Sequence, residues 1–235
     1  MKQLIVNGCS YMHSYASGNG HVDLARRLGI DISHSIAVSG SANSRIIRTT
    51  LKHSYQTTMP ALYVLGMTFL SRLEIPILDK DHEFEGHWVN PQNQQYQHAW
   101  QPGWTKAHLE KWIDLKLRWE SNSVLDRTED LMYQLLSLIE SLHNRSHRVL
   151  IYQQADNLYQ EFLHNPRLKF FDRSEFIDGY KWRAVPWQHQ QGILPTLYFP
   201  PQPDVPRELV HPKPGSHDIL NVFLTNYIQE YKILQ

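Results

Sequence analysis

Two residues near opposite ends of the chain have side chains that together can perform nucleophilic chemistry. Ser10 follows the apolar run at residues 4–6 and Gly8, and His211 precedes the last stretch with helical spacing. A serine hydroxyl becomes a good nucleophile when a base accepts its proton, and an acid usually orients that base. Glu208 lies three residues before His211, so a turn can place its carboxylate against the imidazole. These residues therefore predict a Ser-His-Glu triad.

A triad needs a scaffold, and the hydrophobic pattern predicts one. Apolar runs typical of buried strands occur at residues 4–6, 61–67 and 148–152, and a weaker alternation predicts a strand at 31–38. Helical spacing predicts helices over 20–28 (ending at Gly29), from Ser41 or Asn43 onward with either residue as its cap, over 123–143, and over 216–231.

Strands that alternate with helices at this spacing indicate right-handed crossovers and a parallel sheet. We therefore expect an α/β fold: a three-layer α/β/α sandwich with a parallel, flavodoxin-like sheet of about five strands. The whole chain, 1–235, is expected to be one domain, with a Trp- and His-rich insertion at about 79–121 that holds one helix near 106–119.

Three polar or glycine-bearing turns are expected at the carboxyl ends of the strands, where open parallel sheets bind their ligands. They are Gly8-Cys9-Ser10, Ser39-Gly40-Ser41 and Gly66-Met67-Thr68. Because these ends meet at one edge of the sheet, the three turns are predicted to form one site together with His211.

This order of blocks resembles the SGNH/GDSL hydrolases. That family carries Gly-Asp-Ser after the first strand, a glycine after the second, Gly-x-Asn after the third, and Asp-x-x-His-Pro before the last helix. The corresponding segments here are Gly8-Cys9-Ser10, Ala37-Val38-Ser39-Gly40, Gly66-Met67-Thr68 and Glu208-Leu209-Val210-His211-Pro212. Cys9 replaces the family's Asp, Thr68 its Asn, and Glu208 its Asp.

The resemblance implies a serine esterase that removes a small acyl group from a carbohydrate or similar polar acceptor. Ser10 would attack the carbonyl carbon, His211 would take the proton, and Glu208 would orient His211. The backbone N–H groups of Ser10 and Gly40 would bind the oxyanion. The third donor would be the Thr68 hydroxyl, with Asn43 as a second candidate. No metal or organic cofactor is implied.

Several alternatives remain open from the residues alone. Cys9 can be the nucleophile or a small buried residue, and His217 can be the base. Ser10 can simply satisfy a turn after the first strand. The departures at Thr68 and Glu208 are compatible with a binding or assembly protein that keeps the hydrolase fold. An acyltransferase with the same triad is a third possibility.

Composition excludes some classes and indicates possible partners. Lys+Arg and Asp+Glu are both 23, so the absence of a basic surface argues against nucleic-acid binding. The single cysteine precludes an intrachain disulfide, and no run of about 20 apolar residues predicts a membrane span.

We expect a cytoplasmic protein with a small-molecule or carbohydrate ester as substrate. Arg45 and Arg72 are candidates to bind an anionic part of that substrate. His143 and His147 are interpreted as helix-end residues rather than zinc ligands.

Overall fold

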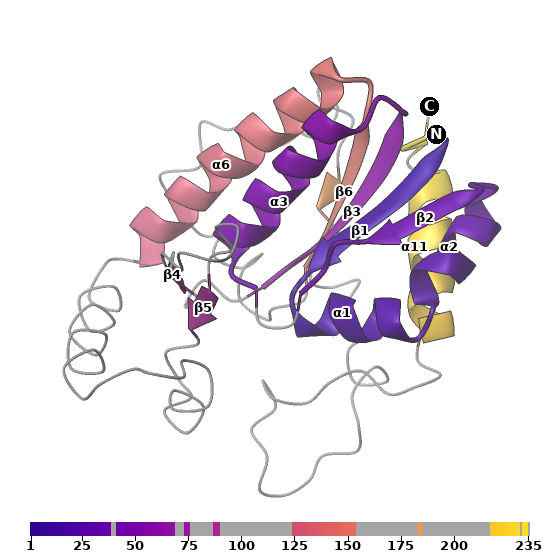
Figure 1. The fold of residues 1–235 in the computed structure, drawn as a ribbon, viewed down its shortest axis with the longest axis horizontal. Helices are drawn as coiled ribbons and strands as arrows, with labels where there is room; N and C mark the ends of the chain where they lie inside the picture. The colour runs from indigo at the N-terminus through magenta and orange to yellow at the C-terminus, as the bar shows by residue number, and fades with distance from the viewer. Residues whose placement is uncertain are drawn as a thin grey trace, which may run out of the picture.

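The computed structural model describes residues 1–38, 41–68, 73–75, 87–89, 124–153, 183–184, 217–230 and 232–234 (Figure 1). Their elements, in chain order, are β1 (Gln3–Gly8), α1 (Ser10–Ser17), α2 (Gly20–Leu28), β2 (Ile32–Ser35), α3 (Asn43–Gln56), β3 (Ala61–Met67), β4 (Leu73–Ile75), β5 (His87–Val89), α6 (Val124–Asn144), β6 (Arg148–Gln153), β7 (Arg183–Ala184) and α11 (His217–Glu230).

The main sheet has five strands in the order β2-β1-β3-β6-β7, and each of its described pairings is parallel. This is the flavodoxin-like order, in which the second strand lies outside the first and the later strands follow on the other side. The predicted parallel sheet of about five strands is therefore confirmed. A separate pair, β4 and β5, is antiparallel.

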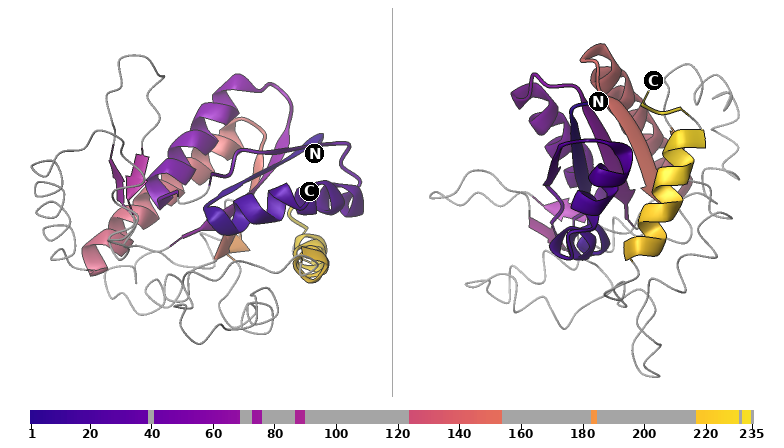
Figure 2. Two further views of the ribbon diagram at one scale, coloured as in Figure 1. Left: turned by 60° about the horizontal axis from the view of Figure 1, so that its bottom comes forward. Right: turned by 90° about the vertical axis from the view of Figure 1, so that its right-hand side faces the viewer.

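Helices cover both faces of this sheet, as Figure 2 shows, with α3 and α6 on one side and α2 and α11 on the other. Alternate residues of β1 face opposite layers: Leu4 and Val6 pack against α1, α2 and α11, and Ile5 packs against α3 and α6. The expected three-layer α/β/α sandwich is confirmed, with one hydrophobic layer on each face of the sheet.

The strongest patterns set element bounds close to the expected ones. β3 occupies the predicted 61–67 and is buried throughout, as a central strand covered on both faces must be. α2 ends where expected, because Gly29 adopts a left-handed φ of 66° and its N–H bonds the carbonyls of Ala25 and Arg26. The long helix α6 and the closing helix α11 each lie within a residue of their predicted bounds.

Other expectations were wrong. Neither Ser41 nor Asn43 caps α3, because the Ser41 hydroxyl donates to the Val38 carbonyl and the Asn43 amide bonds Thr68. The residue at the cap position is Ala42, which makes no side-chain hydrogen bond. The helix α1 was not predicted. β2 is shorter than the expected 31–38.

Part of the predicted insertion at 79–121 is a strand, since β5 falls inside it and pairs with β4. The helix expected at 106–119 lies outside the described residues. Among the helices of the described ranges, none has both the length and the apolar character needed to cross a bilayer.

Candidate active site

The candidate site lies at the carboxyl ends of β1 and β3, where the strand order reverses direction. The chain leaves β1 toward β2 on one side, and β3 then lies on the other side of β1. Gly8 and Gly66 are register partners across the two strands. Ser10 and Thr68 each lie two residues beyond this pair. Neighbouring strands are about 5 Å apart, and ligands of such sheets bind at this reversal.

A close approach between strand and helix explains why Gly8 precedes Ser10. A Cβ on Gly8 would lie 2.5 Å from the Met12 Cγ in α1 and 2.8 Å from the Gly66 carbonyl oxygen in β3. Without a side chain at Gly8, the chain turns sharply out of β1. The His13 N–H bonds the Cys9 carbonyl at 2.9 Å, and α1 begins at Ser10.

This turn places Ser10 at the N-terminus of a helix that starts directly after a central strand. The backbone N–H groups of a first helical turn lack intrahelical partners and carry partial positive charge. Cys9 is fully buried at the base of the turn, as expected for a small apolar residue. The orientation of the Ser10 side chain lies outside the described structure, so its role as nucleophile stays a prediction.

Asn7 fixes the end of β1 and was not predicted to matter. Its Oδ1 accepts the Gly8 N–H at 2.8 Å. Its Nδ2 donates to groups of α3, namely the Ile46 carbonyl at 3.0 Å and the Thr49 and Thr50 hydroxyls at 2.9 Å. Asn7 is fully buried, so these bonds satisfy its amide. An Asn within an otherwise apolar strand was the available signal, because a buried amide requires such partners.

The chain after β2 continues along β1 toward the same turn. The Ile36 N–H bonds the Val6 carbonyl at 2.9 Å, and the Val38 N–H bonds the Gly8 carbonyl at 3.2 Å. The Ser41 N–H and hydroxyl then both donate to the Val38 carbonyl, at 3.2 and 2.8 Å. Gly40, the predicted oxyanion donor between Val38 and Ser41, lies outside the described residues.

The third turn is held by a side chain of α3. The Asn43 Oδ1 accepts the Thr68 N–H at 2.8 Å, and the Asn43 Nδ2 donates to the Thr68 carbonyl at 3.0 Å. Asn43 and Thr68 are 7% and 1% exposed. The Thr68 hydroxyl oxygen is buried and has no hydrogen-bond partner among the described residues. Thr68 is therefore at the predicted edge of the sheet, and its role as an oxyanion donor stays a prediction.

The two arginines predicted to bind substrate differ in what the structure describes. Arg45 lies in the first turn of α3, is only 6% exposed, and donates from Nη1 to the Ser41 hydroxyl at 3.2 Å. It is therefore a buried cation in contact with Ser41. Arg72 lies outside the described residues.

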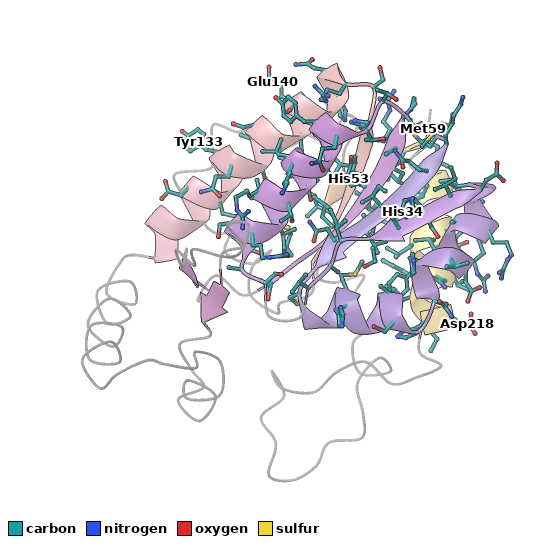
Figure 3. The ribbon with its side chains drawn as sticks, viewed as in Figure 1. His34, His53, Met59, Tyr133, Glu140 and Asp218 are labelled. Atoms are coloured by element: carbon teal, nitrogen blue, oxygen red, sulfur yellow. The ribbon has the colours of Figure 1, made fainter. Side chains whose placement is uncertain are left out.

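The last helix begins at the same edge of the sheet. Asp218, in the first turn of α11, is labelled at the lower right of Figure 3, whereas Met59, just before β3, is labelled at the opposite edge. The Tyr15 hydroxyl of α1 lies 2.5 Å from the Asn221 Oδ1 of α11 and 2.8 Å from the Gly20 carbonyl. The His217 and Tyr15 rings form a T-shaped pair, with centroids 5.5 Å apart. Burial raises the pKa of Tyr15 and lowers that of His217, which favours the neutral form of each side chain.

His211 and Glu208 lie outside the described residues, so the triad stays a prediction. The alternative base, His217, is described and packs against Tyr15, five residues along α1 from Ser10. Its Nε2 is buried without a hydrogen-bond partner among the described residues.

The histidines at residues 143 and 147 belong to the opposite edge of the sheet. His147 is fully buried, and its Nδ1 accepts the Ala61 N–H at 3.1 Å at the start of β3. Burial lowers its pKa, which favours the neutral ring. Within the described part of the chain, no three His, Cys, Asp or Glu side chains are grouped as a metal site.

Comparison with known proteins adds information on the fold. No protein-family model matches the sequence, and no curated protein matches it either. Among solved structures, TesA is similar with a TM-score of 0.54 at 14% identity, over 97% of this chain and 99% of TesA. A member of the lipolytic protein G-D-S-L family from Veillonella parvula has a TM-score of 0.48 at 12% identity, over 97% and 98% of the two chains. The chain therefore shares the α/β fold of TesA over nearly its whole length, in agreement with the fold class predicted from the sequence.

Proposed function

We propose that this chain is a serine ester hydrolase in which Ser10 is the nucleophile, His211 the base and Glu208 the acid that orients it. The observation that carries this proposal is the placement of Ser10 and Thr68. Each lies two residues beyond the register pair Gly8 and Gly66, at the point where the strand order reverses. That point is where flavodoxin-like sheets bind their ligands.

The position of α11 supports His211 as the partner of Ser10. His217 packs on Tyr15 of α1, and His211 is six residues earlier in the chain. Six extended residues span at most about 20 Å, whereas Tyr15 is only about 7.5 Å along the helix axis from Ser10. The chain between His217 and His211 is therefore long enough to bring an imidazole to Ser10. The family resemblance supplies the pairing itself.

In the proposed reaction, the Ser10 oxygen attacks the ester carbonyl carbon while His211 accepts the hydroxyl proton. The carbonyl bond reforms as the alcohol leaves, and His211 returns the proton to the leaving oxygen. Water then attacks the acyl-serine with His211 again as base, which releases the acid and regenerates Ser10. Glu208 stabilises the imidazolium formed in both steps.

Negative charge on the carbonyl oxygen develops only in the transition state, so fixed donors there act directly on the barrier. The proposed donors are the N–H groups of Ser10 and Gly40 and the hydroxyl of Thr68. A buried hydroxyl without a partner is costly, by about 1–3 kcal/mol, and a bound oxyanion would satisfy it. Removing one such donor raises the barrier by roughly 3 kcal/mol, or about 100-fold in rate.

The substrate proposed is a small acyl ester of a carbohydrate or similar polar acceptor, which follows the family resemblance. Arg45 is buried in the first turn of α3, beside the residues that follow β2. With Arg72, it is proposed to hold an anionic group of the substrate.

The test is steady-state hydrolysis of a short-chain aryl ester such as p-nitrophenyl acetate. Ser10→Ala and His211→Ala should lose turnover while the circular dichroism spectrum stays that of the wild type. Ser17→Ala is the matched control: Ser17 lies in the last turn of α1, and its exposed hydroxyl donates only locally, to the His13 carbonyl at 2.9 Å. Full activity in Ser10→Ala would show that Ser10 is not the nucleophile and would turn attention to Cys9.

A binding or assembly protein is the second candidate, and one observation favours it. Two described side-chain amides near this edge, those of Asn7 and Asn43, are already hydrogen-bonded to the protein, and Thr68 stands where related enzymes have asparagine. Such a protein would turn over neither aryl esters nor sugar acetates. An acyltransferase would instead form a new ester when an alcohol or sugar acceptor is added, which product analysis detects.

A further inference from the structure

The end of β3 is joined to α3 through both polar atoms of one side chain. The Asn43 amide accepts from the N–H of Thr68 and donates to its carbonyl, at 2.8 and 3.0 Å. Two residues that exchange both bonds in this way reproduce the closely spaced pair of an antiparallel ladder. Beyond the end of β3 at Met67, the Asn43 side chain therefore takes the place of a neighbouring strand.

This pair of bonds fixes the residue whose hydroxyl is buried without a partner. Thr68 is β-branched, so its χ1 has few favourable values once the backbone is fixed. Holding both the N–H and the carbonyl of Thr68 therefore restricts where its Oγ1 can point. The Thr68 hydroxyl has no hydrogen bond of its own to the described residues that would orient it.

We propose that Asn43 is a positioning residue for the Thr68 hydroxyl, and this inference rests on the proposed ester hydrolysis. In this proposal Asn43 acts through Thr68, because both polar atoms of its amide bond the Thr68 backbone, at 2.8 and 3.0 Å. The proposed oxyanion donor that follows β3 is in this way held by a side chain of α3. The threonine hydroxyl needs such support because it is short and can rotate away.

The chain offers a matched control for a purely structural role. Gln3, at the start of β1, is also a buried amide that makes two bonds: its Nε2 donates to the Thr57 hydroxyl at 2.8 Å and to the Met59 carbonyl at 3.0 Å. These groups follow the end of α3, at the opposite edge of the sheet from Asn43 and Thr68. Gln3→Ala should therefore destabilise the protein much as Asn43→Ala does, without affecting turnover.

The experiment is a double-mutant cycle on kcat and KM for p-nitrophenyl acetate, with Asn43→Ala, Thr68→Val and both together. Asn43→Ala should lower kcat about tenfold and Thr68→Val roughly 10- to 100-fold, each with little change in KM. The double variant should be no slower than Thr68→Val alone, because Asn43 acts only through that hydroxyl. Gln3→Ala should keep kcat within about twofold.

If Asn43→Ala does not fold, Asn43→Asp serves instead, because it keeps the acceptor for the Thr68 N–H and should show a smaller loss of kcat with the same dependence on Thr68. Effects of Asn43 and Thr68 that multiply, or a fall in kcat for Gln3→Ala equal to that for Asn43→Ala, would overturn the inference while leaving ester hydrolysis intact. A wild-type protein that hydrolyses no ester would overturn the proposed function, and this inference with it.

Discussion

The absence of a side chain at Gly8 is the most demanding local requirement of the candidate site, and Gly8→Ala tests it. An added Cβ would meet the Met12 Cγ at 2.5 Å, the Met12 Cβ at 2.8 Å and the Gly66 carbonyl oxygen at 2.8 Å. Favourable carbon contacts lie at about 3.5–4.0 Å, so each of these is a steric overlap.

The size of the effect follows from which groups can move. Met12 is flexible at its far end, but it is fully buried in the layer between β1 and the helices α1, α2 and α11. The Gly66 carbonyl belongs to the backbone of a central strand and cannot shift without disturbing the pairing with β1. Overpacking a well-packed core costs about 1–3 kcal/mol of stability. Because one of the overlaps is with backbone, Gly8→Ala should lower the free energy of unfolding by about 2–3 kcal/mol. Because the relief requires α1 to move, Ser10 moves with it, and kcat should fall at least tenfold.

Two measurements are needed: urea unfolding monitored by tryptophan fluorescence, and the steady-state kinetics of aryl ester hydrolysis. Gly29→Ala is the control: Gly29 has a φ of 66° and nothing within 4 Å of an added Cβ. That variant should lose roughly 1–2 kcal/mol through its left-handed backbone alone and keep its kcat. A Gly8→Ala protein with wild-type kcat and a stability loss below about 0.5 kcal/mol would refute the reasoning.

Three further predictions concern the oxyanion donor, acid stability and the contact between α1 and α11. Thr68→Val should lower kcat with little change in KM, and Thr68→Asn should raise kcat if the longer side chain fits; an unchanged kcat in Thr68→Val would exclude the hydroxyl as a donor. Burial lowers the pKa of His147, so its contribution to stability is complete above its unfolded value of about 6.5 and is lost as pH falls from there toward the lowered value. His147→Asn keeps an acceptor for the Ala61 N–H but does not titrate, so its melting temperature should fall less than the wild type's between pH 7 and 5; an equal fall would contradict this. Tyr15→Phe leaves the buried groups of Gly20 and Asn221 without their partner, and urea unfolding should show a loss of about 1–3 kcal/mol; a loss under about 0.5 kcal/mol would show that the contact contributes little.

The elements predicted well are those whose buried residues form an uninterrupted or regularly repeating apolar pattern in the sequence. β3 is apolar nearly throughout and buried at all seven residues because both of its faces are covered, and its bounds agree with the prediction. α6 also agrees, because its leucines repeat at helical spacing over many turns. In contrast, the described side chains of α1 that are buried and large are Met12 and Tyr15, and two such residues are too few to show a helical period.

The sequence predicted which strand ends form the candidate site, but it did not predict the side-chain contacts that hold those ends in place. Gly8, Ser10 and Thr68 come to one edge because β1 and β3 are parallel neighbours, which the pattern of strands and helices predicts. The partner of Asn43 is 25 residues away, and those of Asn7 are 39–43 residues away. Such pairs depend on how α3 packs on the sheet, so a single sequence without that geometry cannot reveal them.

The most direct test of the central claim is labelling with a fluorophosphonate, which forms a phosphorus–oxygen bond only with an activated serine. Mass spectrometry of the digested protein should place the adduct on Ser10 and should find none in Ser10→Ala. Ser17→Ala should label like the wild type. A wild-type protein that does not react, or an adduct that persists in Ser10→Ala, would contradict the account of this chain as a serine hydrolase acting through Ser10.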